Sequence, residues 1–151
     1  MSDRTAIVFN RSTIQSANPT IPHIVIQITD SQGTEFPPLS EEAKRTRKGV
    51  LQLRFEDMDS LPGIYGRAPF NYILFEKEHA KKILDFVFKE HKDVPLVLVH
   101  CEAGISRSPA TAASLTKIFG KDDADFFKFY MPNRLVYSTI LETAAEEGLI
   151  G

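Results

Sequence analysis

The most informative part of the sequence is the stretch LVLVHCEAGISRSP, residues 96–109. Residues 96–99 are apolar without a break, which is typical of a central strand buried on both faces of a sheet. A helix is predicted to begin near Arg107, because Pro109 fits the first helical turn, where its missing N–H costs little. The stretch therefore predicts a strand, a short loop and a helix in direct succession.

Three other short runs rich in Val, Ile and Leu also read as strands, at residues 6–9, 23–28 and 50–55. Turn residues bound each of them. The densest charged segment, residues 41–48, mixes both signs and is predicted to be a solvated helix or loop face rather than a binding tail. The pattern does not give the order of the strands.

Helices are predicted between and after these strands. Residues 75–91 form the first, residues 107–119 the second, which Gly120 is placed to end, and residues 122–148 read as helical with a break near Pro132. The residues that repeat at helical spacing are Ala80, Ile83, Leu84 and Val87 in the first helix, and Leu135, Val136, Ile140 and Leu141 in the last, which Asn133 could cap. Strands interleaved with helices predict one α/β domain over residues 1–151, with a central, mostly parallel sheet of about four or five strands flanked by helices.

Composition excludes several classes of function. The chain has 151 residues and a net charge of −2, so attraction to phosphates alone would not hold it on nucleic acid. A single cysteine excludes an intramolecular disulfide and a cysteine-rich zinc site. There is no long apolar run and no secretion signal, so no membrane partner is expected, and the cytoplasm is the expected compartment.

The predicted loop between strand and helix has the character of an anion site. The N-terminus of a helix carries about half a positive charge, and successive backbone N–H groups can surround an anion. Cys101 stands at the base of the loop, where the helix terminus and the Arg107 guanidinium both favour the nucleophilic thiolate. Arg107 can also donate to two oxygens of one phosphate. Gly104 allows a tight backbone path, and Ser108 can donate a hydrogen bond toward the sulfur.

The string His100-Cys101-x5-Arg107-Ser108, with Gly104 inside, resembles the phosphate-binding loop of the cysteine-dependent protein tyrosine and dual-specificity phosphatases. The length of the chain and the position of the loop, two-thirds along it, are similar to a compact dual-specificity member. Outside the loop the resemblance is one of pattern only.

The resemblance implies hydrolysis of phosphate monoesters, chiefly phosphotyrosine with phosphoserine and phosphothreonine as further candidates, through a cysteinyl-phosphate intermediate. It implies that Cys101 attacks phosphorus, that Arg107 stabilises the transition state and that Ser108 stabilises the departing thiolate. His100 would set the environment of the loop and the thiol rather than act as a base. No metal or other cofactor is implied. The residues whose backbone would hold the phosphoryl oxygens, together with Arg107, are Glu102, Ala103, Gly104, Ile105 and Ser106.

In this family the general acid is an Asp on a loop upstream of the cysteine. Residues 50–59 fit that place, because strand alternation ends at Phe55, and Asp57 is the first choice with Asp59 as its rival. The spacing from Asp57 to the cysteine is longer than the family usually shows, and residues 61–73 would account for the excess as an extended loop. The absence of Trp-Pro before the Asp argues against the larger tyrosine-specific group.

Other interpretations stay open. Asp57 and Asp59 can be turn residues or helix caps, and Asn133 with Arg134 reads as a helix start to which no chemistry is assigned. A rhodanese-like sulfur transferase also uses a loop cysteine in an anion cradle, and a phosphate-binding module without catalysis is the non-enzyme alternative. Glu102 places a negative charge beside the nucleophile, which favours a phosphorylated protein or a small phosphomonoester over polyanionic inositol phosphates.

Overall fold

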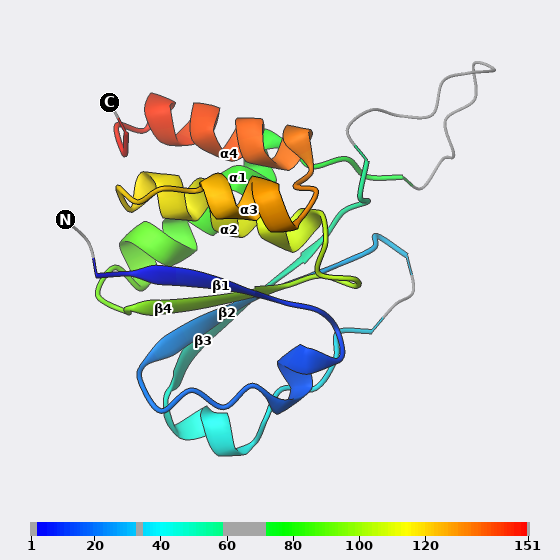
Figure 1. Ribbon diagram of the computed structural model, residues 1–151, viewed down its shortest axis with the longest axis vertical. Coiled ribbons are helices and arrows are strands. Elements are labelled where there is room, and N and C mark those ends of the chain that lie inside the picture. Colours follow the sequence, from blue (N-terminus) through cyan, green and yellow to red (C-terminus); the bar gives the residue numbers. More distant parts are fainter. Residues whose placement is uncertain (1–2, 33–34, 59–71, 151) are drawn as a thin grey trace.

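The computed structural model describes residues 3–32, 35–58 and 72–150, and within them a parallel sheet is covered by helices (Figure 1). The strands, in the spatial order β1-β4-β2-β3, are β1 (Thr5–Phe9), β2 (His23–Thr29), β3 (Arg47–Arg54) and β4 (Leu96–His100). Every neighbouring pair is parallel. The helices on one side of the sheet are α1 (Lys77–Asp85), α2 (Arg107–Ile118), α3 (Ala124–Phe129) and α4 (Arg134–Glu146). The predicted α/β fold class is confirmed.

The central position of β4 explains its uninterrupted apolar sequence. β4 pairs with β1 on one side and with β2 on the other. Val97 and Val99 face the core beneath the helices, whereas Leu98 packs in a smaller cluster with Ile14 and Val25. That smaller cluster lies on the opposite side of the sheet, which the 3₁₀-helices η1 (Thr13–Ser16) and η2 (Glu42–Arg45) cover. Both faces of β4 are buried, as the sequence predicts.

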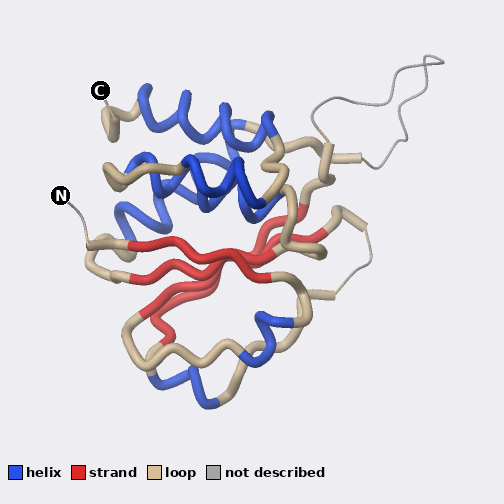
Figure 2. The backbone as a smooth tube through the Cα atoms, in the orientation of Figure 1, coloured by secondary structure: helices blue, strands red, loops and turns tan. Residues whose placement is uncertain are grey.

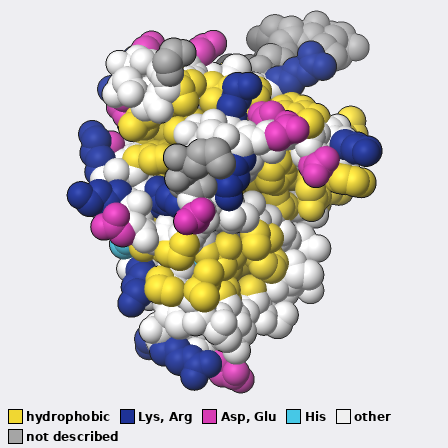
Figure 3. Space-filling view, turned by 60° about the vertical axis from the view of Figure 1, so that its left-hand side comes forward, with side chains coloured by type: hydrophobic (Ala, Val, Ile, Leu, Met, Phe, Trp, Pro, Cys, Tyr) yellow, Lys and Arg dark blue, Asp and Glu magenta, His cyan; other side chains and the backbone are white. Residues whose placement is uncertain are grey.

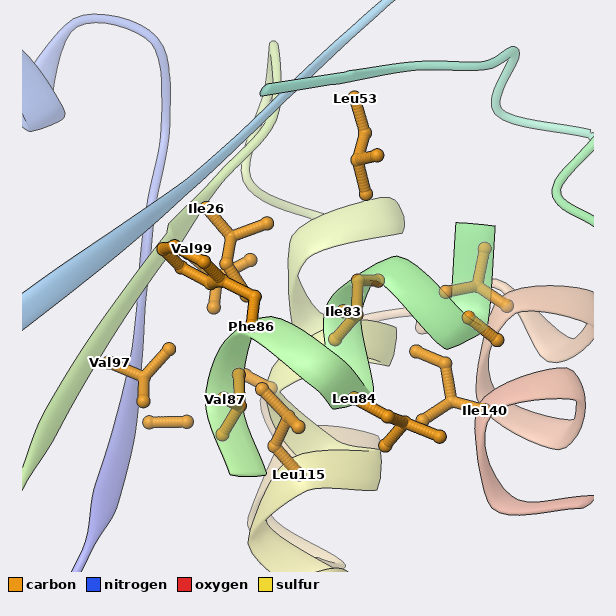
Figure 4. Packing of buried hydrophobic residues seen from close by; sticks show 14 of the residues in the cluster. Ile26, Leu53, Ile83, Leu84, Phe86, Val87, Val97, Val99, Leu115 and Ile140 are labelled. Carbon is orange, nitrogen blue, oxygen red and sulfur yellow. The ribbon is translucent and has the colours of Figure 1, made fainter. Parts of the chain in front are cut away.

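The main core lies between the sheet and the helices (Figure 4). Leu84 of α1 points toward Ile140 of α4, and Val87 lies close to Leu115 of α2. Each fully buried side chain of this size contributes about 1.5–3 kcal/mol through the hydrophobic effect. The buried residues include all four that define the predicted apolar face of the first helix, Ala80, Ile83, Leu84 and Val87.

The end of α2 follows from a single glycine. Gly120 has a φ of +86°, in the left-handed region that L-residues with a side chain avoid. Its N–H donates to the carbonyl of Lys117 at 3.0 Å, and the N–H of Lys121 donates to the carbonyl of Thr116 at 3.0 Å. This pair of hydrogen bonds is the Schellman arrangement, which satisfies carbonyls left open at a helix end. The predicted role of Gly120 is confirmed.

Some element boundaries differ from the expected ones. The first helix begins at Lys77, and its last turn widens into a π-helical segment, η3 (Phe86–Glu90). The charged segment 41–48 is only partly a solvated face, because η2 occupies its first half and β3 already begins at Arg47.

The predicted cap of α4 is confirmed, since the Asn133 side chain accepts a hydrogen bond from the N–H of Val136.

Parallel strands place their carboxyl ends at one edge of the sheet, where α/β proteins bind ligands. The first residues after β1, β2, β3 and β4 are Asn10, Asp30, Phe55 and Cys101. Figure 2 shows the loops that follow the strands at the side of the molecule opposite the two labelled termini. The fold therefore brings three distant parts of the chain to the loop that contains Cys101.

The surface carries charges of both signs. Figure 3 shows one face with a hydrophobic patch just below its centre and further hydrophobic groups in the upper half, with Lys and Arg side chains and Asp and Glu side chains between and around them. None of the helices in the described part of the chain is both long enough and apolar enough to span a bilayer.

Candidate active site

The residues from 101 to 106, called here the Cys101 loop, connect β4 to α2 and pack against the end of β1. Gly104 in this loop has a φ of +71°. A Cβ atom added there would lie 3.0 Å from the carbonyl oxygen of Phe9 and 3.1 Å from Cβ of Asn10. The N–H of Arg11, the residue after Asn10, donates to the carbonyl of Glu102 in the loop at 3.0 Å. The close approach and the backbone angle both require glycine.

The sulfur of Cys101 lies at the floor of the loop. Its side chain is 3% exposed, and Sγ is 3.1 Å from Oγ of Ser108. The backbone N–H of Ser108 also donates to Sγ, at 3.4 Å. Ser108 belongs to the first turn of α2, where the helix dipole favours negative charge. The structure thus brings together the thiol and the hydroxyl that the sequence pattern pairs.

One nitrogen anchors the guanidinium of Arg107, and the opposite edge of the guanidinium makes no hydrogen bond to the described residues. Nη1 donates to Oδ1 of Asp30 and to the carbonyl of Phe55, each at 2.8 Å. Nε is buried, and neither it nor Nη2 donates to an acceptor within the described residues. The Nε and Nη2 donors lie on one side of the planar group, which suits two oxygens of one phosphate.

Asp30 was not singled out by the sequence. It follows β2 directly and forms an ion pair with Arg107, a residue 77 positions further along the chain. The signal that could have found it is topological: an aspartate at the end of a strand that runs parallel to β4 ends at the same edge of the sheet.

Asp57 lies against the Cys101 loop. Its Oδ1 accepts a hydrogen bond from Oγ of Ser106 at 2.6 Å and another from Nδ2 of Asn133 at 3.0 Å. The rival candidate, Asp59, lies outside the described residues, as does most of the segment 61–73. The sequence predicts Asn133 only as a helix start, because its contact with a residue 76 positions away has no local sequence signal.

The carboxylate of Glu102 is paired with neighbouring side chains. Its Oε1 accepts a hydrogen bond from Oγ1 of Thr29 at 2.6 Å and forms an ion pair with Nη1 of Arg11 at 3.2 Å. Arg11 also donates to the carbonyl of Glu35. The expected repulsion of polyanions by a free Glu102 carboxylate is therefore wrong, because the neighbouring guanidinium of Arg11 compensates this charge.

His100 is a buried, neutral imidazole. Burial lowers the pKa of His100 from 6.5 to about 4, against smaller raising effects of a hydrogen bond to Cys101 and the charge of Glu102. Its Nδ1 lies 3.4 Å from the carbonyl of Cys101, and its Nε2 is buried without a partner in the described part of the chain. The ring is buried at the end of β4.

A cleft of about 650 Å³ opens beside the Cys101 loop. Three of its residues, Asp57, Ser106 and Asn133, belong to the arrangement just described, and Ile105, Phe127 and Met131 give it exposed apolar side chains. A second cleft of about 360 Å³ adjoins Asp57 and is lined by Asp30, Gln32, Glu56, Met58 and Tyr72. In the described parts of the chain, His, Cys, Asp and Glu side chains form no group of three suited to a metal ion.

The parallel sheet, the helical layer and the Cys101 loop define the fold of the compact dual-specificity phosphatases. The chain is similar to the human tyrosine phosphatase-like serine/threonine/tyrosine-interacting protein, with 19% identity, a TM-score of 0.59, and coverage of 94% of this chain and 92% of that one. It is also similar to human DUSP28, with 13% identity, a TM-score of 0.56, and coverage of 95% and 93%.

A third similar structure is that of Tk-PTP in the active form, with 14% identity, a TM-score of 0.53, and coverage of 93% of this chain and 90% of that one. No family model and no curated protein sequence matches the chain. At these identities the likeness establishes the fold, and the chemistry is argued from the residues of the site.

Proposed function

We propose that this protein hydrolyses phosphate monoesters, chiefly phosphotyrosine in proteins, through a phosphorylated Cys101. The observation that carries the proposal is the hydrogen bonding of the Arg107 guanidinium, which is anchored at one edge and has an unpaired donor at the other. Asp30 and the carbonyl of Phe55 anchor its Nη1, and the buried Nε has no acceptor among the described residues. A buried cationic edge of this kind, at the start of the helix that holds Ser108 against the thiol, suits a phosphate dianion.

In the first step the Cys101 thiolate attacks phosphorus, the sulfur–phosphorus bond forms and the bond to the leaving oxygen breaks. Arg107 and the amides of the loop stabilise the charge on the three phosphoryl oxygens. The leaving oxygen takes a proton from Asp57, which the contacts with Ser106 and Asn133 hold beside the loop. The products of this step are the free alcohol or phenol and the cysteinyl phosphate.

In the second step water attacks the phosphorus of the cysteinyl phosphate. Asp57, now a carboxylate, accepts a proton from that water, and the sulfur–phosphorus bond breaks to release inorganic phosphate. The departing thiolate receives hydrogen bonds from the hydroxyl and the N–H of Ser108, whose oxygen and nitrogen lie 3.1 and 3.4 Å from Sγ. These two donors lower the barrier for release of the thiolate.

The surroundings of the site favour a monophosphorylated protein over a polyanionic inositol phosphate. Asp30, Glu56 and Asp57 line one cleft, and apolar side chains form only part of the wall of the other, which also includes Arg134. The Glu56 carboxylate, which has no ion-pair partner among the described residues, disfavours further phosphate groups here, in place of the predicted effect of Glu102. Among similar structures, PTPMT1 was solved in complex with PI(5)P, at 16% identity, a TM-score of 0.51, and coverage of 97% of this chain and 94% of that one.

A phosphate-binding module without catalysis is the second candidate. The observation that favours it is that Cys101 is only 3% exposed, and one structural neighbour is named phosphatase-like. Such a module would bind a phosphorylated partner through Arg107 and the loop but would not release phosphate. A rhodanese-like function is less well supported, because sulfur transfer does not explain the anchored guanidinium.

Hydrolysis of 4-nitrophenyl phosphate in the presence of a metal chelator tests the proposal. We expect turnover by the native protein, none by Cys101→Ser, and retained binding of vanadate by that variant. Turnover by Cys101→Ser would refute the role of the thiol, and vanadate binding without turnover by the native protein would favour the second candidate.

The general acid is identified by comparing the pH–rate profiles of Asp57→Ala and Asp59→Ala. Only the variant that lacks the acid loses the limb of the profile that reports the protonated acid. A phosphotyrosine peptide and a soluble inositol phosphate, compared at equal concentration, test the substrate class.

A further inference from the structure

The buried side chain of Asn133 connects three segments at the site. It is 7% exposed, and its Oδ1 accepts the capping hydrogen bond from the N–H of Val136 at 3.1 Å. Its Nδ2 donates to Oδ1 of Asp57 at 3.0 Å and to the carbonyl of Met58 at 3.3 Å. Its backbone N–H donates to the carbonyl of Ser106 in the Cys101 loop at 3.0 Å. One residue therefore joins the start of α4, the Cys101 loop and the segment after β3.

The orientation of the Asn133 amide is fixed by chemistry. The N–H of Val136 needs an acceptor, and only Oδ1 of the amide can accept. The Nδ2 group, which only donates, must then face the other way, toward Asp57. Helix capping and the contact with Asp57 are thus two consequences of one side-chain orientation.

The contacts of Asp57 leave one of its oxygens for the reaction. Ser106 and Asn133 both donate to Oδ1. Within the described residues Oδ2 accepts no hydrogen bond, so it is the oxygen that can carry a proton to a leaving group. Asp57 lies three residues beyond the end of β3, and these two donors are the side chains that hold its carboxylate.

We infer that Asn133 is a positioning residue for Asp57, and that it aligns the general acid with the leaving oxygen through the hydrogen bond to Oδ1. The inference rests on the proposed phosphatase function and adds to it a residue from the C-terminal helix. Misplacement of a catalytic group by about 1 Å can cost roughly 100-fold in rate. The loss must appear only where protonation of the leaving group limits the reaction.

The test uses Asn133→Ser and two substrates. Serine caps helices about as well as asparagine but has no amide to reach Asp57. Phenyl phosphate needs its leaving group protonated, whereas 4-nitrophenyl phosphate releases a stable anion. We expect kcat for phenyl phosphate to fall roughly 10- to 100-fold, and kcat for 4-nitrophenyl phosphate to fall by less than about threefold. Asn18→Ser, which changes an exposed asparagine bonded to Glu42, is the matched control and should leave both rates unchanged.

A double-mutant cycle completes the test. In an Asp57→Asn background, Asn133→Ser should have no further effect on phenyl phosphate, because the residue that it positions is already lost. An equal loss on both substrates, or an undiminished loss in that background, would overturn the inference and leave the proposed function standing. A native protein inactive on both substrates would overturn both. Should Asn133→Ser unfold at lower urea than the native protein, Asn133→Asp, which also keeps a cap acceptor, must show the same selective loss or the inference fails.

Discussion

Replacing Gly104 with alanine should destabilise the protein by about 3 kcal/mol, as two separate costs. The φ of +71° costs an L-residue about 1–2 kcal/mol. The added Cβ would also lie 3.0 Å from the carbonyl oxygen of Phe9 and 3.2 Å from Cα of Asn10. Both are backbone atoms, which cannot rotate aside, and overpacking of this kind costs about 1–3 kcal/mol.

Gly120→Ala separates the two costs. Its φ of +86° is also positive, but a Cβ there meets no atom within 4 Å, so only the first cost, about 1–2 kcal/mol, applies. Urea unfolding of both variants at pH 7 measures the difference, which we expect to be about 1–3 kcal/mol. Gly104→Ala should also lower kcat/KM for 4-nitrophenyl phosphate roughly 100-fold by displacing the loop, and Gly120→Ala should not. If the two variants unfold at the same urea concentration, the close contact between the loop and β1 is refuted.

Three further predictions follow from the site. Ser108→Ala removes a donor 3.1 Å from the sulfur, so release of the thiolate should become limiting, and stopped-flow mixing with 4-nitrophenyl phosphate should show a burst of nitrophenol; a linear onset would contradict this. Asp30→Asn keeps an acceptor for Arg107 but removes the charge that orients it, and kcat/KM should fall roughly 10-fold; an unchanged value would show that Phe55 anchors the guanidinium alone. The pKa of His100, about 4, lies below the 6.5 of an unfolded histidine, so the unfolded chain takes up the proton first and stability should fall as the pH drops from about 6.5 to about 4. Urea midpoints at pH 7 and pH 5 should converge in His100→Gln, and an unchanged pH dependence would argue against this histidine as its source.

Much of the fold could be predicted because local patterns were clear. The apolar run 96–99 has to be buried on both faces, and Gly120 has to end a helix, whatever the rest of the chain does. The strand order β1-β4-β2-β3 could not be predicted, because it depends on packing between elements far apart in sequence. The π-helical end of the first helix also gives no local signal that distinguishes it from an ordinary turn.

The candidate site likewise has a part that local sequence predicts and a part that it does not. The Cys101 loop is contiguous in sequence, so its cysteine, glycine and arginine could be singled out together. Asp30 and Asn133 reach the loop only through tertiary structure. Asp30 is 77 residues from its partner Arg107, and Asn133 is 76 residues from its partner Asp57. The charge of Glu102 was read without its partner, because Arg11 is 91 residues away. The sequence therefore points to the contiguous loop and to Asp57 as candidates, and it gives no signal for Asp30 or for the contact of Asn133 with Asp57.

The two faces of the sheet bury apolar clusters of unequal size, and the face with the smaller cluster supports the Cys101 loop. Among the described residues, the face under η1 and η2 buries the small cluster Ile14, Val25 and Leu98, with Phe9, Ala17, Leu39 and Leu96 partly buried against it, whereas the helical face buries the main core. Regions with few buried apolar contacts open at lower free energy than the rest of a protein. Arg11, which holds Glu102 through both its backbone and its guanidinium, lies just before η1. On warming, this layer should loosen first, so that heat should abolish the proposed phosphatase activity while the helices are still intact.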